Sequence, residues 1–142
     1  MISYHTEDIK KPNICTRRTS AWVKNVAASH GKTIGEIAYI FCSDPYILEV
    51  NKQYLQHDYF TDIITFDYSE GNKISGDLFI SLDTVKSNAE QFRTDYYEEL
   101  ERVIIHGILH LCGFKDKEPA EEARMREEEN KAISSLEKPL KK

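Results

Sequence analysis

Long hydrophobic runs are absent from this 142-residue sequence. No stretch approaches the roughly 18 consecutive apolar residues of a membrane-spanning helix. The first residues, MISYHTEDIKK, lack the apolar segment that a secretory signal peptide requires. We therefore expect a protein that does not enter a membrane and that works in the cytoplasm.

Cysteine is scarce as well. The sequence has 3 cysteines, Cys15, Cys42 and Cys112, which are far apart and include no C-x-x-C pair. Such a set indicates free thiols in a reducing compartment rather than a disulfide framework. Internal repeats and low-complexity linkers are also missing. A chain of this length can close one apolar core, so we expect one domain over residues 1–142, with residues 137–142 frayed.

An excess of positive charge is the third thing that the sequence lacks. The formal net charge is -5, which argues against a protein that coats nucleic acid through a uniformly basic surface. A local basic groove stays compatible with this charge, because electrostatic steering depends on where the charges lie.

The order of patterns along the chain predicts a mixed α+β fold. Residues rich in β-branched and aromatic types predict strands at 2–6, 33–42, 62–68 and 74–81, the last two joined as a hairpin by SEGNK. Helix signals predict five helices at 17–29, 44–55, 83–92, 95–112 and from 119 onward. The expected N-caps are Thr16, Asp44, Asp83 and Asp95. The fold class is therefore α+β: a small mixed β-sheet packed with about five helices.

The stretch HGILHLCGFKD, residues 106–116, contains the strongest chemical signal. His106 and His110 are four residues apart and share a face of the predicted helix. Gly113 allows a sharp reversal, after which Asp116 brings a carboxylate back toward them. Three ligands of this kind leave a coordination position for water, as in catalytic zinc sites. Two histidines at this spacing are also common as structural residues, and mixed nitrogen and oxygen ligation suits nickel or manganese too.

Four features together resemble the YbeY family of rRNA-maturation endoribonucleases. They are the stretches VNKQYLQHDYFTDIITFDY, ISGDLFISLDTV and ERVIIHGILHLCGFKDK and the spacing among them, and they cover the chain from about residue 44 to 117. The resemblance implies a zinc-dependent, single-strand-specific endoribonuclease. It implies action on the 16S rRNA precursor in 3′-end maturation and in ribosome quality control, with the ribosome or its small subunit as partner. It also implies His106 and His110 as zinc ligands.

The sequence departs from the family pattern at two positions. The family's third ligand is usually a histidine ten residues after the first, and here that offset falls on Asp116. A carboxylate binds Zn²⁺ about as readily as an imidazole does. The family also has an arginine where this chain has Leu55, so its role is lost, shared or taken over by a cation such as Lys52, His57 or Lys115.

Two further residues are candidates for catalysis. His57, in a loop before a predicted strand, is a candidate for proton transfer, and Asp62 for orienting ligands or capping that strand. A solvated loop histidine is an equally acceptable interpretation of His57.

Gly107 stands where a zinc protease would carry its glutamate base. RNA supplies its own nucleophile, so a nuclease can dispense with that glutamate; alternatively Gly107 lets the helix approach a neighbouring element. Two other functions stay open: a metalloprotease-like hydrolase, and a non-catalytic, metal-stapled module that associates with the ribosome.

Overall fold

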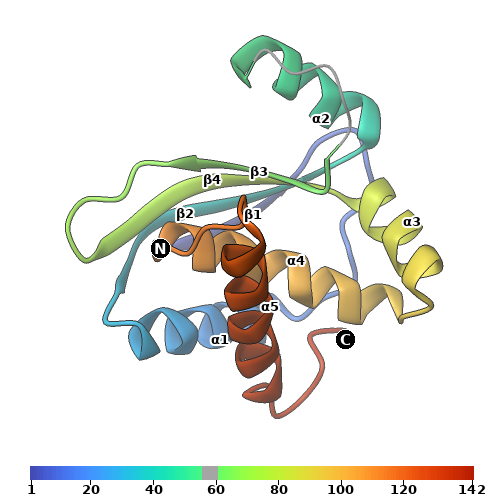
Figure 1. The fold of residues 1–142 in the computed structure, drawn as a ribbon. Coiled ribbons are helices and arrows are strands. Elements are labelled where there is room, and N and C mark those ends of the chain that lie inside the picture. Colours follow the sequence, from blue (N-terminus) through green and yellow to red (C-terminus); the bar gives the residue numbers. More distant parts are fainter. Residues whose placement is uncertain (56–60) are drawn as a thin grey trace.

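The computed structural model describes residues 1–55 and 61–142 (Figure 1). Four strands and five α-helices are found in these residues, and a short π-helix, η1, continues α2. Their bounds are β1 Ile2–Thr6, α1 Thr16–Ser29, β2 Thr33–Cys42, α2 Asp44–Val50, η1 Asn51–Leu55, β3 Ile63–Asp67, β4 Lys73–Ser81, α3 Leu82–Phe92, α4 Tyr96–Leu111 and α5 Pro119–Ser134. The predicted α+β class is confirmed.

The four strands form one mixed sheet in the order β1-β2-β4-β3. β1 and β4 both run parallel to β2, whereas β3 pairs with β4 in the antiparallel hairpin that the sequence predicted. β3 is therefore an edge strand, and its first residue follows directly on Asp62.

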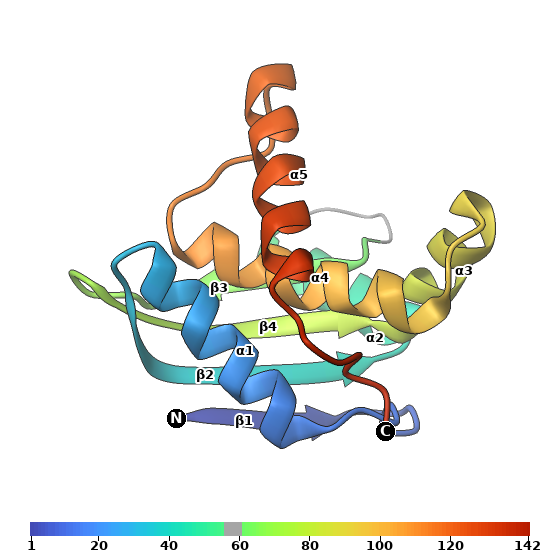
Figure 2. The ribbon, with the colours of Figure 1, turned by 90° about the horizontal axis from the view of Figure 1, so that it is seen from below.

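Helices α1, α4 and α5 lie on one face of the sheet, while α2 lies on the other face at one end (Figures 1 and 2). α4 is the central helix, because it contacts α1, α3 and α5 as well as β3 and β4. Its buried side chains include Ile104, Ile105, Ile108 and Leu109, all at 0% exposure. Two of the candidate metal ligands, His106 and His110, thus stand on this central helix.

At Gly107, α4 packs tightly against β3 and β4. A Cβ atom at this position would lie 2.8 Å from Cδ1 of Ile63 and 3.0 Å from Cδ2 of Leu78. These separations are shorter than ordinary packing contacts between carbon atoms. The close approach between the helix and β3 and β4 accounts for the glycine.

Three of the predicted helix caps are wrong. Thr16, Asp44 and Asp83 lie within their helices, and the N-cap positions are Cys15, Ser43 and Ser81. The two serine hydroxyls accept from backbone N–H groups of their helices. Asp44 and Asp83 instead join α2 to α3, since Asp83 accepts from the Asp44 backbone N–H at 2.9 Å and Asp44 accepts from the Ser81 hydroxyl at 2.6 Å. The predicted Asp95 cap is confirmed by its bonds from Tyr97 and Glu98.

The C-terminal residues 137–142 are not frayed, contrary to the expectation from sequence. Leu140 is 0% exposed. Its backbone N–H donates to the buried carboxylate of Glu101 at 2.9 Å, and its carbonyl accepts from Cys15 at 2.7 Å. With the bonds from Arg18 to the Pro139 carbonyl at 2.6 Å and from the Lys142 N–H to the Asn13 carbonyl at 3.0 Å, four hydrogen bonds and one apolar side chain hold the polar PLKK segment against the body of the protein.

Two expectations from composition can be compared with the structure. Cys15, Cys42 and Cys112 are free thiols, as predicted. Within residues 1–55 and 61–142, no helix is both long enough and apolar enough to cross a membrane.

Candidate metal centre

Three side chains converge where α4 ends and the chain turns back. Nε2 of His106 lies 3.2 Å from Oδ2 of Asp116, and Nε2 of His110 lies 3.3 Å from Oδ1 of the same residue. Gly113 makes the reversal possible, with a φ of 107° that side-chain-bearing residues rarely adopt. The residues that the sequence proposed as ligands are therefore brought together, on a central helix and the turn after it.

The spacing of these donor atoms fits a metal ion. One ligand atom from each of His106, His110 and Asp116 can be chosen so that all lie within 4.8 Å of one another. Zinc ligands at 2.0–2.2 Å in a tetrahedron lie about 3.4 Å apart, close to both distances between Asp116 and the histidines. The side chains are 20%, 34% and 35% exposed in this order, so the group could hold a metal ion and remain accessible.

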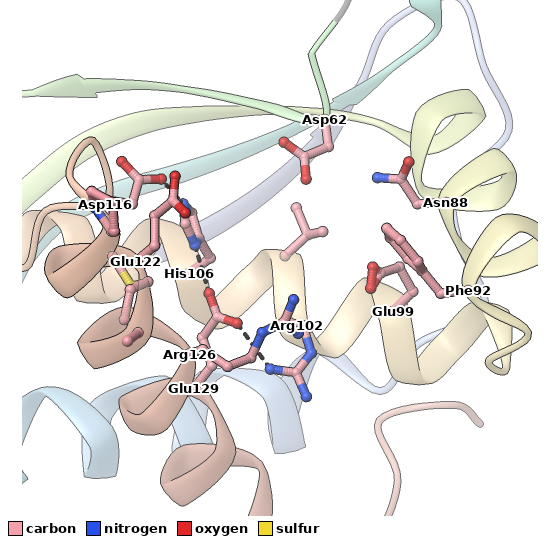
Figure 3. A pocket seen from close by; sticks show the side chains of 14 residues that line it. Asp62, Asn88, Phe92, Glu99, Arg102, His106, Asp116, Glu122, Arg126 and Glu129 are labelled. Carbon is pink, nitrogen blue, oxygen red and sulfur yellow. Dashed lines mark hydrogen bonds and ion pairs between the residues drawn. The ribbon is translucent and has the colours of Figure 1, made fainter.

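A buried carboxylate contacts the ring nitrogen of His106 that does not face Asp116. Oε2 of Glu129, on α5, lies 2.6 Å from Nδ1 of His106, and its Oε1 accepts from Arg102 at 2.9 Å. Figure 3 shows Glu129 between the imidazole and the guanidinium. Burial lowers the pKa of His106, but the hydrogen bond and charge of Glu129, together with the charges of Asp116 and Asp62, raise this pKa above its ordinary value. The bond fixes the ring with Nε2 toward Asp116.

Asp62 lies beside this group, at the start of the edge strand. Two cavities, of about 630 and 280 Å³, flank the histidines, and Asp62, His106 and Asp116 line both of them. Burial raises the pKa of Asp62, and the neighbouring His106 lowers it in part. The other candidate for catalysis, His57, lies outside the described residues.

The remaining histidines and Cys112 lie elsewhere. His5 hydrogen-bonds Ser3 on β1, and His30 at the end of α1 lies 3.6 Å from Glu128. Cys112 packs against the main core. Neither these histidines nor Cys112 is among the side chains that meet at Asp116.

Comparison with known proteins shows the family of this chain. The family model described as Endoribonuclease YbeY matches residues 2–137. The chain belongs to the endoribonuclease YbeY family. An Endoribonuclease YbeY of Phocaeicola vulgatus is 68% identical over 96% of this chain and 99% of its own. One from Porphyromonas gingivalis is 52% identical over 95% of this chain and 89% of its own.

A solved structure of similar fold extends the comparison. The solution structure of TM1509 from Thermotoga maritima has a TM-score of 0.67 and 25% identity, and the match covers 96% of this chain and 89% of that one. The family resemblance, the α+β class and the meeting of His106, His110 and Asp116 were all accessible from sequence. Glu129 was not, because it belongs to the run Glu127–Glu129, where no pattern marks the one carboxylate that reaches His106.

Glu129→Gln is expected to weaken zinc binding by roughly 10–100-fold, the usual cost of losing such a supporting carboxylate. The measurement is a zinc titration against a competing chelator at pH 8, where protons compete least with the metal for His106. Glu127→Gln is the matched control, since Glu127 is exposed on the same helix and pairs only with Lys131 among the described residues. Equal zinc affinity in the Glu129 variant and the wild type would contradict the orienting role.

Proposed function

We propose that this protein is a zinc-dependent, single-strand-specific endoribonuclease of the cytoplasm. It acts in 16S rRNA 3′-end maturation and in ribosome quality control, with the small ribosomal subunit as partner. The observation that carries the proposal is the group His106, His110 and Asp116, open to two cavities, in a chain of the endoribonuclease YbeY family. We infer one zinc ion per chain, which nickel or another divalent ion can replace in a purified sample.

The chemistry divides between the metal, the RNA and the protein. His106, His110 and Asp116 would hold a zinc ion, and Glu129 keeps the His106 ring oriented. A bound ion would supply a Lewis acid for the phosphate and would lower the pKa of its bound water toward about 7. The Asp62 carboxyl, whose pKa is raised by burial, lies where it can hold or accept a proton beside the phosphate. His57 stays a second candidate for proton transfer.

A metalloprotease-like hydrolase is the weaker alternative. It would need a carboxylate base beside the first histidine, and Gly107 has none. A side chain at residue 107 would leave the helix toward Ile63 and Leu78, where even its Cβ would lie 2.8 and 3.0 Å from existing carbon atoms. A casein cleavage assay with added zinc is expected to show no activity.

A non-catalytic, metal-stapled module is also weaker. Structural zinc sites are closed by four protein ligands, whereas this group brings three partly exposed side chains together at the edge of two cavities. The core of α4 is apolar and complete without an ion. We therefore expect the protein to stay folded when the metal is removed.

The decisive experiment follows cleavage and folding in parallel. Metal-depleted protein, with and without added zinc, is incubated with a single-stranded oligoribonucleotide, its duplex, and a 16S rRNA fragment with an extended 3′ end. Cleavage of the single strand and of the extension is expected only with metal, and circular dichroism is expected to show the same secondary structure in both forms. Metal-independent cleavage, or no cleavage by the zinc-loaded protein, would overturn the proposal.

Asp62→Asn is expected to lower kcat for RNA cleavage by about 100-fold, the lower range for loss of a group that transfers protons. Zinc stoichiometry should stay at the wild-type value, because Asp62 is not one of the three converging residues. Single-turnover kinetics and metal analysis on the same sample test both statements. Thr61→Val, a change at the neighbouring residue, serves as the control. Full activity of Asp62→Asn would remove Asp62 from the mechanism.

A further inference from the structure

The larger cavity extends from the metal centre to helix α3. It has a volume of about 630 Å³, and α3, α4 and α5 all contribute to its wall. Figure 3 shows Asn88 and Phe92 on one side of it and His106 and Asp116 on the other. A cavity of this size can take a nucleoside. The part near α3 is not used by the mechanism above.

The charges of this cavity disfavour a phosphate away from the metal. Two arginines line it, and Glu129 already pairs with one of them, Arg102. Among the residues that the structure describes, five carboxylates line it as well: Asp62, Glu99, Asp116, Glu122 and Glu129. A negative phosphate would be repelled here, whereas an uncharged group that donates hydrogen bonds would be accepted. RNA carries such groups on the edges of its bases.

Phe92 gives the cavity an aromatic wall. Its side chain is 58% exposed, so little of this large apolar surface is used in folding. Asn88 is four residues earlier on α3 and lies on the same face of the helix. Aromatic side chains of this kind are stacking surfaces for unpaired bases, which are the parts of single-stranded RNA that proteins recognise.

Glu99 lines the cavity between Phe92 and the metal centre (Figure 3). It is half-buried, and burial raises its pKa. No side chain in residues 1–55 and 61–142 makes a hydrogen bond or ion pair with its carboxylate. His106 follows seven residues later, on the same face and about 10 Å along the helix axis. That separation lets a phosphate sit at the metal while the attached base reaches Glu99.

We propose that this cavity is a base-binding subsite selective for guanine, in which Phe92 stacks on the ring and Glu99 accepts from N1–H and N2–H. The inference rests on the proposed ribonuclease function and names the specificity of its site. Guanine is the base whose Watson–Crick edge offers two adjacent donors to one carboxylate, a bidentate match. Adenine and cytosine place an acceptor beside their donor, which the carboxylate would repel.

Nucleotide binding tests the subsite without any cleavage. GMP and AMP are titrated into the protein by calorimetry, with and without zinc, so that the phosphate contributes equally to both. GMP is expected to bind about 10-fold more tightly, within the range for a bidentate contact to a base. Glu99→Gln should bind GMP and AMP with equal affinity. Equal affinities in the wild type, or an unchanged ratio in Glu99→Gln, would overturn the proposal.

Two matched controls separate the subsite from general effects of charge and surface. Glu98→Gln makes the same change at the neighbouring exposed position of α4 and should leave the ratio intact. Phe92→Ala should weaken the binding of both nucleotides by about 10-fold, as expected for the loss of one stacking contact. Tyr68→Ala removes an aromatic ring of similar exposure, 59%, from the β3–β4 hairpin and should change neither affinity.

Cleavage then distinguishes a failure of the subsite from a failure of the proposed function. The substrates are single-stranded oligouridylates that carry one central guanosine or one central adenosine. The wild type is expected to cut beside guanosine about 10-fold faster, and Glu99→Gln to cut both alike. Cleavage without preference would reject the subsite and leave the nuclease standing. Guanine-selective binding without any cleavage would reject the proposed nuclease function and leave the subsite standing.

Discussion

Asp116→Ala is expected to lower zinc affinity by roughly 100-fold or more and to reduce RNA cleavage with it. Loss of a supporting partner alone costs 10–100-fold in metal affinity, and Asp116 is the residue whose two oxygens approach both histidines, at 3.2 and 3.3 Å. Removing it leaves the ion with two nitrogen donors and no carboxylate ligand. Zinc stoichiometry after dialysis and initial rates on a single-stranded substrate provide the measurement.

Two further variants show whether the donor or its charge matters. Asp116→His replaces the carboxylate with an imidazole donor, so zinc binding and cleavage should both persist. Asp116→Asn keeps the size of the side chain but loses the charge that favours a divalent ion, and zinc binding should fall. If the alanine variant binds zinc fully and cuts RNA at the wild-type rate, Asp116 is not a ligand.

Stability provides the internal control for this series. If Asp116 were the cap of the last helix, its removal would cost about 1 kcal/mol. The N-cap of α5 is Glu118 instead, whose backbone N–H donates to Glu121 at 3.0 Å. The pairing of Asp116 with the histidines is one-third exposed and contributes little in water. The metal-free variants should therefore melt close to the metal-free wild type.

The elements of this fold were predictable because their signals are local. The β-branched run at Thr33–Cys42 and the Asp95 cap before α4 each specify their structure within a few residues. The capping errors at Asp44 and Asp83 arose because each aspartate follows a serine within two residues, Ser43 and Ser81. Serine and aspartate are almost equally good caps. Serine is the cap in both helices because the aspartates take part in the contact between α2 and α3, which the sequence does not reveal.

The residues of the site likewise fall into those that local spacing predicts and those that depend on how the helices pack. His106 and His110 share a face because of helix geometry, and Gly113 returns the chain to Asp116, so this group was predictable from spacing alone. Glu129 reaches His106 from a different helix, and its 2.6 Å contact depends on how α5 crosses α4. The α3 wall of the larger cavity was missed for the same reason, since it lies beside the metal centre only after α3 packs against α4.

Gly107→Glu is expected to destabilise the protein by about 3–5 kcal/mol, the range for an unpaired charge buried in a core. The side chain would leave the helix toward Ile63 and Leu78, where even a Cβ atom would lie 2.8 and 3.0 Å from existing carbons. Thermal denaturation of the metal-free protein gives the measurement. The variant is also expected to show no casein cleavage, because the new carboxylate is directed at the sheet.

Gly107→Ala separates the steric effect from the charge. Overpacking of this kind costs about 1–3 kcal/mol, and alanine recovers up to about 1 kcal/mol through its better helix propensity. Ile63→Val removes Cδ1, the atom that the new Cβ would approach most closely. In a double-mutant cycle, Gly107→Ala should therefore be less destabilising in the Ile63→Val background than in the wild type. Additive effects, together with a Gly107→Glu variant that melts like the wild type, would show that α4 does not need the glycine to reach the sheet. The missing glutamate would then have to be explained by the chemistry of the site instead.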